Sequence, residues 1–280
     1  MNNKIYPCLW FDNNAKEAAS FYCSIFNGSS ITSENPIVVR FKLGGEKFIA
    51  LNGGPLFKPN PSISMFALFE TEDETKSVWD KLNDGGTVLM PLDKYPWSNL
   101  YGWVQDKFGI SWQVYTGSMN NVGQRFTPLL MFTGAQNGNA DNAIQFYTSL
   151  FPNSSVNGIA RYAAGEGDVE GRVKHAQFIL NDYVFMAMES SGPHDFTFNE
   201  AISIVVECDT QEEIDHYWNT FTKDGGQESM CGWLKDKYGV SWQIVPSVLG
   251  SLMSDPEKSP RVIQAFMQMK KFEIEKLLNA

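Results

Sequence analysis

His175 is the residue of this chain whose type and position best suit acid–base chemistry. It lies in an alternating strand pattern, and Glu189 ends the strand pattern that follows. If their common face lines a cavity, the imidazole and the carboxylate can act as a base and its partner. The alternative is a partly buried histidine held by hydrogen bonds. The other histidines, His194 in a loop and His216 on a charged helix, are expected to face solvent.

Two glutamines lie near the end of a motif that the chain contains twice. Residues 102–114 have the sequence GWVQDKFGISWQV and residues 232–244 have GWLKDKYGVSWQI, so that eight of thirteen positions are identical. In the first copy, Asp106 and Gly109 suit positions i and i+3 of a type I turn, and the second copy repeats this placement. The motif is therefore predicted to be a β-hairpin.

The turn also predicts which side chains of the hairpin share a face. It sets Trp103 opposite Trp112, and in the second copy Trp233 opposite Trp242. Cross-strand aromatic pairs of this kind stabilise a sheet. These tryptophans are expected to pack beneath the helices as core, and the alternative is that they stack on a ligand.

The other face of each hairpin is expected to line a small-molecule site. Gly102 would lie opposite Gln113, and Gly232 opposite Gln243. A glycine beside a hydrogen-bonding amide leaves space for a ligand. The predicted ligand-binding residues are Gln243, Gly232, Gln177, Ser203, Gln113 and Gly102.

The hairpin belongs to a duplication that covers most of the chain. For example, Phe21-Tyr22 recurs as Phe146-Tyr147. Within each copy, short strands and amphipathic helices alternate as two βαβββ units. We therefore predict an α+β protein of four βαβββ units and a C-terminal helix capped by Ser259. The predicted segments are a first domain at 1–118, a linker at 119–126, a second domain at 127–250 and a tail at 251–280.

Composition limits the partners and the compartment. The chain has 22 Lys and Arg against 32 Asp and Glu, for a net charge of −10. This charge disfavours nucleic acid and anionic membranes as partners. No apolar run reaches the length of a membrane helix, the N-terminus lacks a signal-peptide profile, and the four cysteines form no C-x-x-C pair. We expect a cytoplasmic protein with reduced thiols.

Three stretches carry a resemblance to a known family. They are FNEAISIVVECDTQEEIDHYW (198–218), DGGQESMCGWLKDKYGVSWQIVP (224–246) and RVIQAFMQMKKFEIEKL (261–277). In these the chain resembles the vicinal oxygen chelate superfamily, which includes glyoxalase I, bleomycin-resistance proteins and extradiol dioxygenases. More narrowly it resembles the PhnB-like branch, labelled the 3-demethylubiquinone-9 3-methyltransferase family. The resemblance implies curled sheets around a pocket, and a pseudo-dimer within one chain.

The residues depart from the metal-binding pattern of that superfamily. Its metal-dependent members carry a carboxylate where this chain has Gln113 and Gln243, and further ligands on the first and fourth strands. Here the fourth strands end in Asn52 and Glu189. Because a divalent ion needs several charged or imidazole ligands, we expect no divalent metal. No glycine-rich turn for S-adenosylmethionine follows a strand, so no cofactor is predicted.

Two classes of function stay open at this point. The first is a metal-free pocket that binds a small, partly aromatic molecule, as in bleomycin-resistance proteins. The second is an enzyme of the lyase, isomerase or transferase type, with the acid and base in the second domain. The second copy alone has His175 and Glu189, where the first has Val38 and Asn52. Substitution of Gln243 or Glu189 is therefore expected to weaken ligand binding more than substitution of Gln113.

Overall fold

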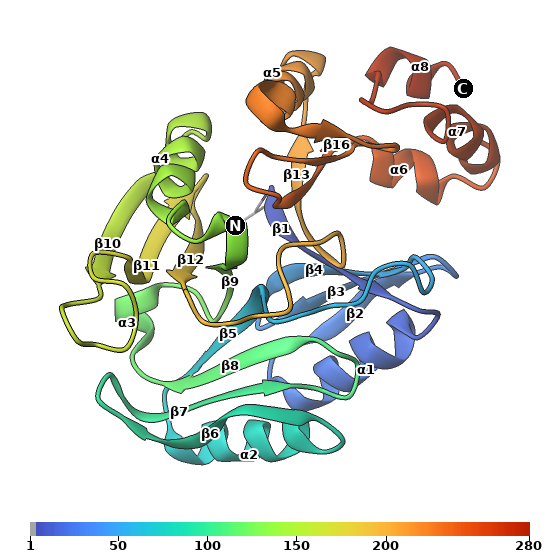
Figure 1. Ribbon diagram of the computed structural model, residues 1–280. Helices are drawn as coiled ribbons and strands as arrows, with labels where there is room; N and C mark the ends of the chain where they lie inside the picture. Colours follow the sequence, from blue (N-terminus) through green and yellow to red (C-terminus); the bar gives the residue numbers. More distant parts are fainter. Residues whose placement is uncertain (1–3) are drawn as a thin grey trace. The chain divides into compact units, whose positions relative to one another are not determined.

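The computed structural model describes residues 4–280 and contains the four predicted βαβββ units (Figure 1). The first copy consists of β1 (Ile5–Phe11), α1 (Ala15–Ile25), β2 (Ser30–Glu34), β3 (Val38–Leu43), β4 (Glu46–Asn52), β5 (Ile63–Phe69), α2 (Glu72–Asn83), β6 (Thr87–Tyr95), β7 (Ser98–Gln105) and β8 (Ser111–Thr116). The prediction of an α+β fold built from these units is confirmed. Strands β6 and β7 span residues 87–105, whereas their counterparts in the second copy span residues 227–235, so this hairpin is longer in the first copy.

A short helix, α3 (Met119–Val122), joins the copies. The second copy consists of β9 (Phe126–Phe132), α4 (Ala140–Leu150), β10 (Ser155–Arg161), β11 (Val173–Leu180), β12 (Tyr183–Glu189), β13 (Ile202–Cys208), α5 (Gln211–Thr222), β14 (Gln227–Glu228), β15 (Trp233–Lys235) and β16 (Ser241–Pro246). Single 3₁₀ turns, η1 (Gly134–Gln136) and η2 (Lys223–Gly225), flank α4 and α5. No helix among residues 4–280 is long and apolar enough to cross a membrane.

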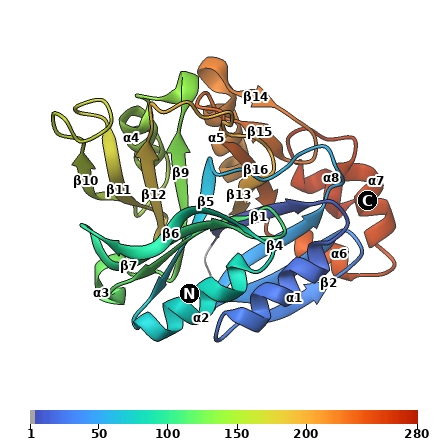
Figure 2. The ribbon, with the colours of Figure 1, turned by 60° about the horizontal axis from the view of Figure 1, so that its bottom comes forward.

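The larger of two compact units comprises Pro7–Ile202. It contains an eight-stranded sheet in the order β10-β11-β12-β9-β5-β8-β7-β6 (Figure 2). At its centre, β5 of the first copy pairs antiparallel with β9 of the second, with Ile63 opposite Leu130. α2 packs on β7 and β8, and α4 packs on β11. The same unit holds β1 from Pro7 onward and strands β4, β3 and β2, which pair in this order, and α1 packs on β2, β3 and β4.

The smaller unit comprises the described residues up to Tyr6 together with Ser203–Ala280. Strands β14, β15, β16 and β13 pair in this order. The first described residues lie beside β13, because the Glu207 amide donates to the Lys4 carbonyl at 2.8 Å. Each compact unit therefore contains residues of both copies of the duplication. The units do not coincide with the sequence repeats, which are residues 1–118 and 127–250.

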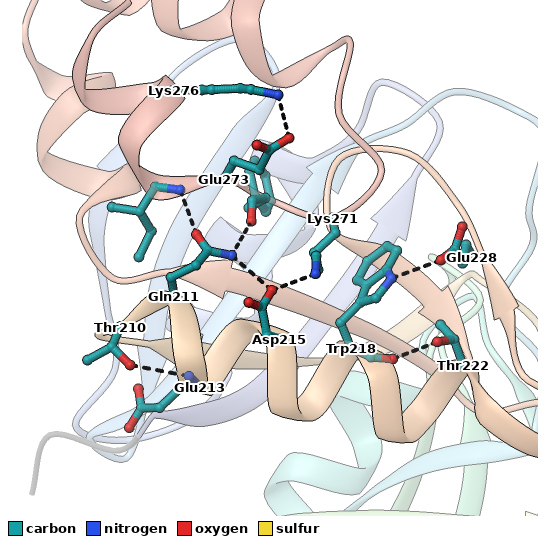
Figure 3. A network of polar contacts seen from close by, with 12 residues as sticks. Thr210, Gln211, Glu213, Asp215, Trp218, Thr222, Glu228, Lys271, Glu273 and Lys276 are labelled. Carbon is teal, nitrogen blue, oxygen red and sulfur yellow. Dashed lines mark hydrogen bonds and ion pairs between the residues drawn. The ribbon is translucent and has the colours of Figure 1, made fainter.

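The tail forms three short helices: α6 (Leu249–Ser254), α7 (Ser259–Phe266) and α8 (Ile274–Leu278). The prediction of one helix capped by Ser259 is wrong, because Lys258 is the cap and Ser259 is the first helical residue. The apolar face was predicted better, since Val262, Met269 and Phe272 are buried. Figure 3 shows how polar residues of α5 bind the segment around Phe272, whose carbonyl accepts a 3.0 Å hydrogen bond from Gln211.

The repeated motif forms the predicted hairpin around the predicted turn. The Gly109 amide donates to the Asp106 carbonyl at 2.9 Å, as a type I turn requires. The Asp106 amide in turn donates to the Ile110 carbonyl at 2.9 Å. Gly109 has φ +86°, which marks a type I turn followed by a bulge residue. The loop is therefore one residue longer than a simple type I turn.

That extra residue shifts the register of the hairpin by one. Trp103 pairs with Gln113, and Val104 pairs with Trp112. The prediction that the two tryptophans face each other is wrong, since a one-residue slip moves every side chain of one strand to the other face. Trp112 is fully buried in the helix-side core, as expected, but Trp103 lies on the opposite face.

The second copy shows the same register and the same correction. Trp233 pairs with Gln243, and Leu234 pairs with Trp242. Trp242 is fully buried and stacks on Phe221 of α5, with ring centroids 4.5 Å apart. The bulge is thus part of the repeated motif rather than an irregularity of one copy.

The two glycines of the motif make room for the protein's own rings. A Cβ atom on Gly102 would lie 2.5 Å from the Trp79 ring of α2. A Cβ atom on Gly232 would lie 2.5 Å from the Phe272 ring, and its φ of +81° also favours glycine. The prediction that Gly102 faces Gln113 and leaves space for a ligand is therefore wrong, and the Gly232 position is filled in the same way.

One buried carboxylate organises the first hairpin. Asp106 Oδ2 accepts hydrogen bonds from Tyr22 Oη at 2.7 Å and Trp112 Nε1 at 2.9 Å. Its Oδ1 accepts from the Phe108 and Ile110 amides at 2.8 and 3.0 Å. Asp106 thus joins helix α1, strand β8 and its own turn.

We predict that Asp106→Asn lowers the free energy of unfolding by about 2–4 kcal/mol, because the new amide group must face two donors. Tyr22→Phe is the matched control, which removes a single hydrogen bond and is expected to cost about 1 kcal/mol. Urea unfolding measures both. Equal losses from the two variants would contradict the central role of the carboxylate.

Candidate functional site

The larger unit has an apolar cluster on the face of its eight-stranded sheet that points away from α2 and α4, here called the inner face. Its buried members come from strands β5, β7, β9 and β12: Phe66, Leu68, Tyr101, Trp103, Leu129, Met131 and Met186. Partly buried residues pack against them: Met90, Tyr95, Tyr115, Met119, Val122, Met188 and Phe196. The cluster therefore combines aromatic rings with flexible methionine side chains.

A chain of polar groups is buried beside these apolar side chains. Tyr101 Oη donates to Gln113 Oε1 at 2.8 Å, and Gln113 Nε2 donates to Ser64 Oγ at 2.8 Å. Trp103 Nε1 donates to Ser111 Oγ at 2.7 Å. Burial, with a smaller contribution from Tyr95, raises the pKa of the Tyr101 hydroxyl, which therefore stays protonated.

Gln113 was predicted from the sequence as a ligand-binding residue, Trp103 was expected in the core with ligand stacking as the alternative, and Tyr101 was not predicted. Both lie at the inner face, because Trp103 pairs with Gln113 and Tyr101 pairs with Tyr115. With the correct hairpin register, the sequence would have placed Tyr101, Trp103 and Gln113 on one face of the hairpin, because side chains alternate between the two faces. Tyr95 and Trp97 of the β6–β7 turn extend the aromatic surface, with ring centroids 5.6 and 6.0 Å from that of Tyr101.

His175 and Gln177 contribute to the same inner face from β11. Gln177 pairs with Met186 of the cluster, and His175 follows the same alternation. The Gln177 Nε2 atom lies 3.4 Å from the Val122 carbonyl oxygen. His175 is partly buried, and among the described residues no side chain forms a hydrogen bond with its imidazole. Burial lowers the pKa of His175, which keeps the ring neutral near pH 7.

Glu189 lies on the other face of the sheet and does not pair with His175. Its carboxylate is buried and accepts hydrogen bonds from the Ala140 amide at 3.1 Å and the Val173 amide at 2.6 Å. In the first copy, the Asn52 side chain accepts from the Ala15 amide at 2.9 Å. Both residues satisfy an N–H group at the start of a helix. The prediction that Glu189 assists His175 is therefore wrong.

The remaining predicted residues belong to the smaller unit. Gln243 Nε2 donates to Ser203 Oγ at 2.9 Å, which repeats the contact between Gln113 and Ser64. In the same unit, Tyr6 Oη of β1 donates to Glu207 Oε1 of β13 at 2.7 Å. His175 and Gln177 therefore share a sheet with Gln113, while Gln243 and Ser203 lie in the other compact unit. The prediction of a single cavity built from the second copy is wrong.

Two hollows of the smaller unit lie at the tail, and we do not assign function to them. The larger, about 590 Å³, is lined by residues at the starts of α5 and α8. Its polar side chains bind each other: Lys271 pairs with Asp215, and Gln211 donates to Asp215 at 3.1 Å (Figure 3). These contacts hold the tail against α5.

The donor atoms at the inner face do not fit a divalent metal. Both side-chain polar atoms of Gln113 are committed, to Tyr101 and Ser64. Glu189, the carboxylate expected beside His175, faces the other side of the sheet. Within residues 4–280, no group of three or more His, Cys, Asp or Glu side chains is arranged to hold an ion.

Comparison with known proteins identifies the class. Glyoxalase I from Zea mays is similar over 90% of this chain and 97% of that chain, at 11% identity and a TM-score of 0.56, which shows a shared fold. The chain thus has the glyoxalase-like fold of vicinal oxygen chelate proteins, as the sequence resemblance implied.

The family follows from the sequence. The model of the 3-demethylubiquinone-9 3-methyltransferase family matches residues 3–115 and again 124–245, so the chain belongs to this family as a tandem duplication. A PhnB protein from Bacillus cereus, described as a putative 3-demethylubiquinone-9 3-methyltransferase, is 35% identical over 41% of this chain and 100% of that chain, with a TM-score of 0.39. No curated protein matches the chain.

The lowered pKa of His175 predicts an acid-sensitive contribution to stability. The unfolded chain takes up a proton on this histidine near pH 6.5, whereas the folded protein does so at lower pH. The free energy of unfolding is therefore expected to fall below pH 6.5, by at most about 1.4 kcal/mol per pH unit from this residue. His175→Gln should lessen the fall measured by urea unfolding between pH 7.5 and 5.5.

His216→Gln, on the exposed surface of α5, serves as the control for this experiment. If both variants keep the full acid sensitivity of the unaltered protein, burial of His175 is not its source.

Proposed function

We propose that the protein binds a small, partly aromatic molecule at the inner face of the larger unit, and does so without a metal ion. One observation carries this proposal: aromatic and methionine side chains gather beside a buried polar chain. Of the 11 methionines, Met90, Met119, Met131, Met186 and Met188 belong to the cluster. Methionine side chains are flexible and polarisable, so such a surface can reshape around an aromatic ring.

The polar groups supply the orientation that an apolar surface lacks. Tyr101 Oη donates to Gln113 at 2.8 Å at one side of the cluster, and the same hydroxyl oxygen can accept a hydrogen bond from a ligand. Across the sheet, His175 presents a neutral imidazole that can donate or accept one hydrogen bond. A ligand with an apolar ring and one uncharged polar substituent matches this combination.

The neutral probe N-phenyl-1-naphthylamine tests this proposal, because its fluorescence rises in an apolar site. Met188→Glu places a charge on the partly buried part of the inner face and is expected to weaken probe binding at least about tenfold, or 1.4 kcal/mol. Met230→Glu makes the same change at an exposed residue of the smaller unit and should leave binding unaltered. Equal probe binding by the unaltered protein and Met188→Glu would overturn the proposal.

The metal-free state has its own test. Purified protein is expected to carry less than one equivalent of Zn, Ni, Mn or Fe, because the donor set around Gln113 and His175 lacks charged ligands. EDTA should leave the melting temperature unchanged. A full equivalent of bound metal, with a lower melting temperature after chelation, would refute the expectation.

A second candidate is an enzyme that uses His175 as a general base. The partly buried, neutral ring without a side-chain partner favours it, since a base needs an unprotonated nitrogen directed at its substrate. The two candidates differ in outcome. A ligand recovered chemically unchanged after incubation supports binding, whereas a conversion that His175→Gln abolishes while probe affinity is kept supports the enzyme.

A further inference from the structure

The tip of the β6–β7 hairpin, residues 94–98, carries an exposed tryptophan. Trp97 is 52% exposed, whereas the other seven of the chain's eight tryptophans, all within residues 4–280, are buried or half-buried. Tryptophan has a large apolar surface and is enriched where proteins bind partners. Trp97 is therefore the tryptophan of this chain that a molecule from solution reaches most easily.

Two tyrosines hold the Trp97 ring in place. The ring of Tyr95 stacks on it, with centroids 5.0 Å apart and an interplanar angle of 23°. Tyr101 meets the same indole edge-on, at 6.0 Å and 72°. Tyr95 is itself fixed, because its hydroxyl donates to the Pro91 carbonyl at 3.0 Å. The exposed part of the indole is thus presented in one orientation, which lowers the entropy lost when an aromatic ligand stacks on it.

The tip is continuous with the inner face of the eight-stranded sheet. Tyr101 is a buried member of the apolar cluster there, and Tyr95 packs against that cluster. On the neighbouring strand β8, Tyr115 pairs with Tyr101, and its ring centroid lies 5.3 Å from that of Phe66 on β5. Aromatic rings therefore follow one another from β5 across β8 and β7 to Trp97.

The second copy shows that the hairpin forms without this tip. Its strands β14 and β15 are two and three residues long, and residues 229–232 join them. In the repeated motif, Cys231 occupies the place of Tyr101, so the aromatic support for a tryptophan is missing as well. The aromatic tip is therefore an addition of the first copy at the end of the inner face, and the fold does not require it.

We propose that Trp97 sets the size of the ligand: the molecule bound at the inner face has at least two aromatic rings, and its outer ring stacks on Trp97. The tip lies beyond β7, which is two strand spacings or about 10 Å from β5, more than one aromatic ring covers. Stacking on Trp97 adds to the affinity only when the ligand reaches it. This inference rests on the function proposed for the inner face and names the class of ligand, a neutral compound with two or more aromatic rings.

Two neutral alcohols test the proposal: benzyl alcohol and 2-naphthalenemethanol, which share the hydroxymethyl group and differ by one ring. Calorimetry on the full chain is expected to show at least about tenfold tighter binding of the naphthyl compound. Trp97→Ala should weaken binding of the naphthyl compound at least about fivefold and change that of benzyl alcohol by less than about twofold. Leu56→Ala, which removes another exposed apolar side chain of the same unit, should leave both affinities unaltered.

Trp97→Phe separates ring stacking from the structure of the hairpin. It keeps an aromatic ring at the tip and is expected to retain the affinity for the naphthyl compound within about threefold. An unaltered preference for the naphthyl compound in Trp97→Ala would refute the role of Trp97. Binding of N-phenyl-1-naphthylamine without binding of the naphthyl alcohol would overturn this inference alone. If the unaltered protein binds neither alcohol nor that probe, the function proposed for the inner face fails together with it.

Discussion

The buried carboxylate of Asp106 is the constraint on which the arrangement of the larger unit depends. Four donors converge on its two oxygens, from the turn itself, from Trp112 and from Tyr22 of helix α1. A buried charge is tolerated when hydrogen bonds replace the lost water. Because Asp106 occupies the first position of the turn and Gly109 adds a bulge residue, the hairpin has one register. That register puts Trp112 under the helices, and Gln113 and Trp103 at the inner face.

Corresponding positions of the two copies keep the same structural role on the helix side of the sheets, and they differ in side-chain chemistry on the opposite face. At the start of a helix, Asn52 and Glu189 are equivalent, since each accepts a hydrogen bond from the first turn. A carboxylate and an amide oxygen thus fill the same structural role in the two copies. On the opposite face, the substitutions between the copies change the charge and polarity that a ligand would meet.

The two strand pairs illustrate that divergence. β11 and β12 present His175, Gln177 and methionines, while β3 and β4 present Arg40, Lys42 and aliphatic residues. Both pairs have the same antiparallel register and the same buried alternate residues, so the helix-side packing is conserved within the molecule. A scaffold duplicated in this way can keep its core and change its surfaces independently, because strand alternation separates the two sets of side chains.

The amino-acid sequence by itself determined the local elements and their repetition. Strand alternation, amphipathic helices and turn residues such as Asp106 and Gly109 depend on neighbours within a few positions, so the four βαβββ units could be predicted. The family could be recognised for the same reason. The pairing of the tryptophans could not, since the bulge at Gly109 adds a residue that composition alone does not reveal. Only the tertiary structure decided which units share a sheet: β5 pairs with β9 of the other copy, so His175 joins Gln113 and not Gln243. Such pairing depends on contacts between residues far apart in the chain, whose free energy no local pattern encodes.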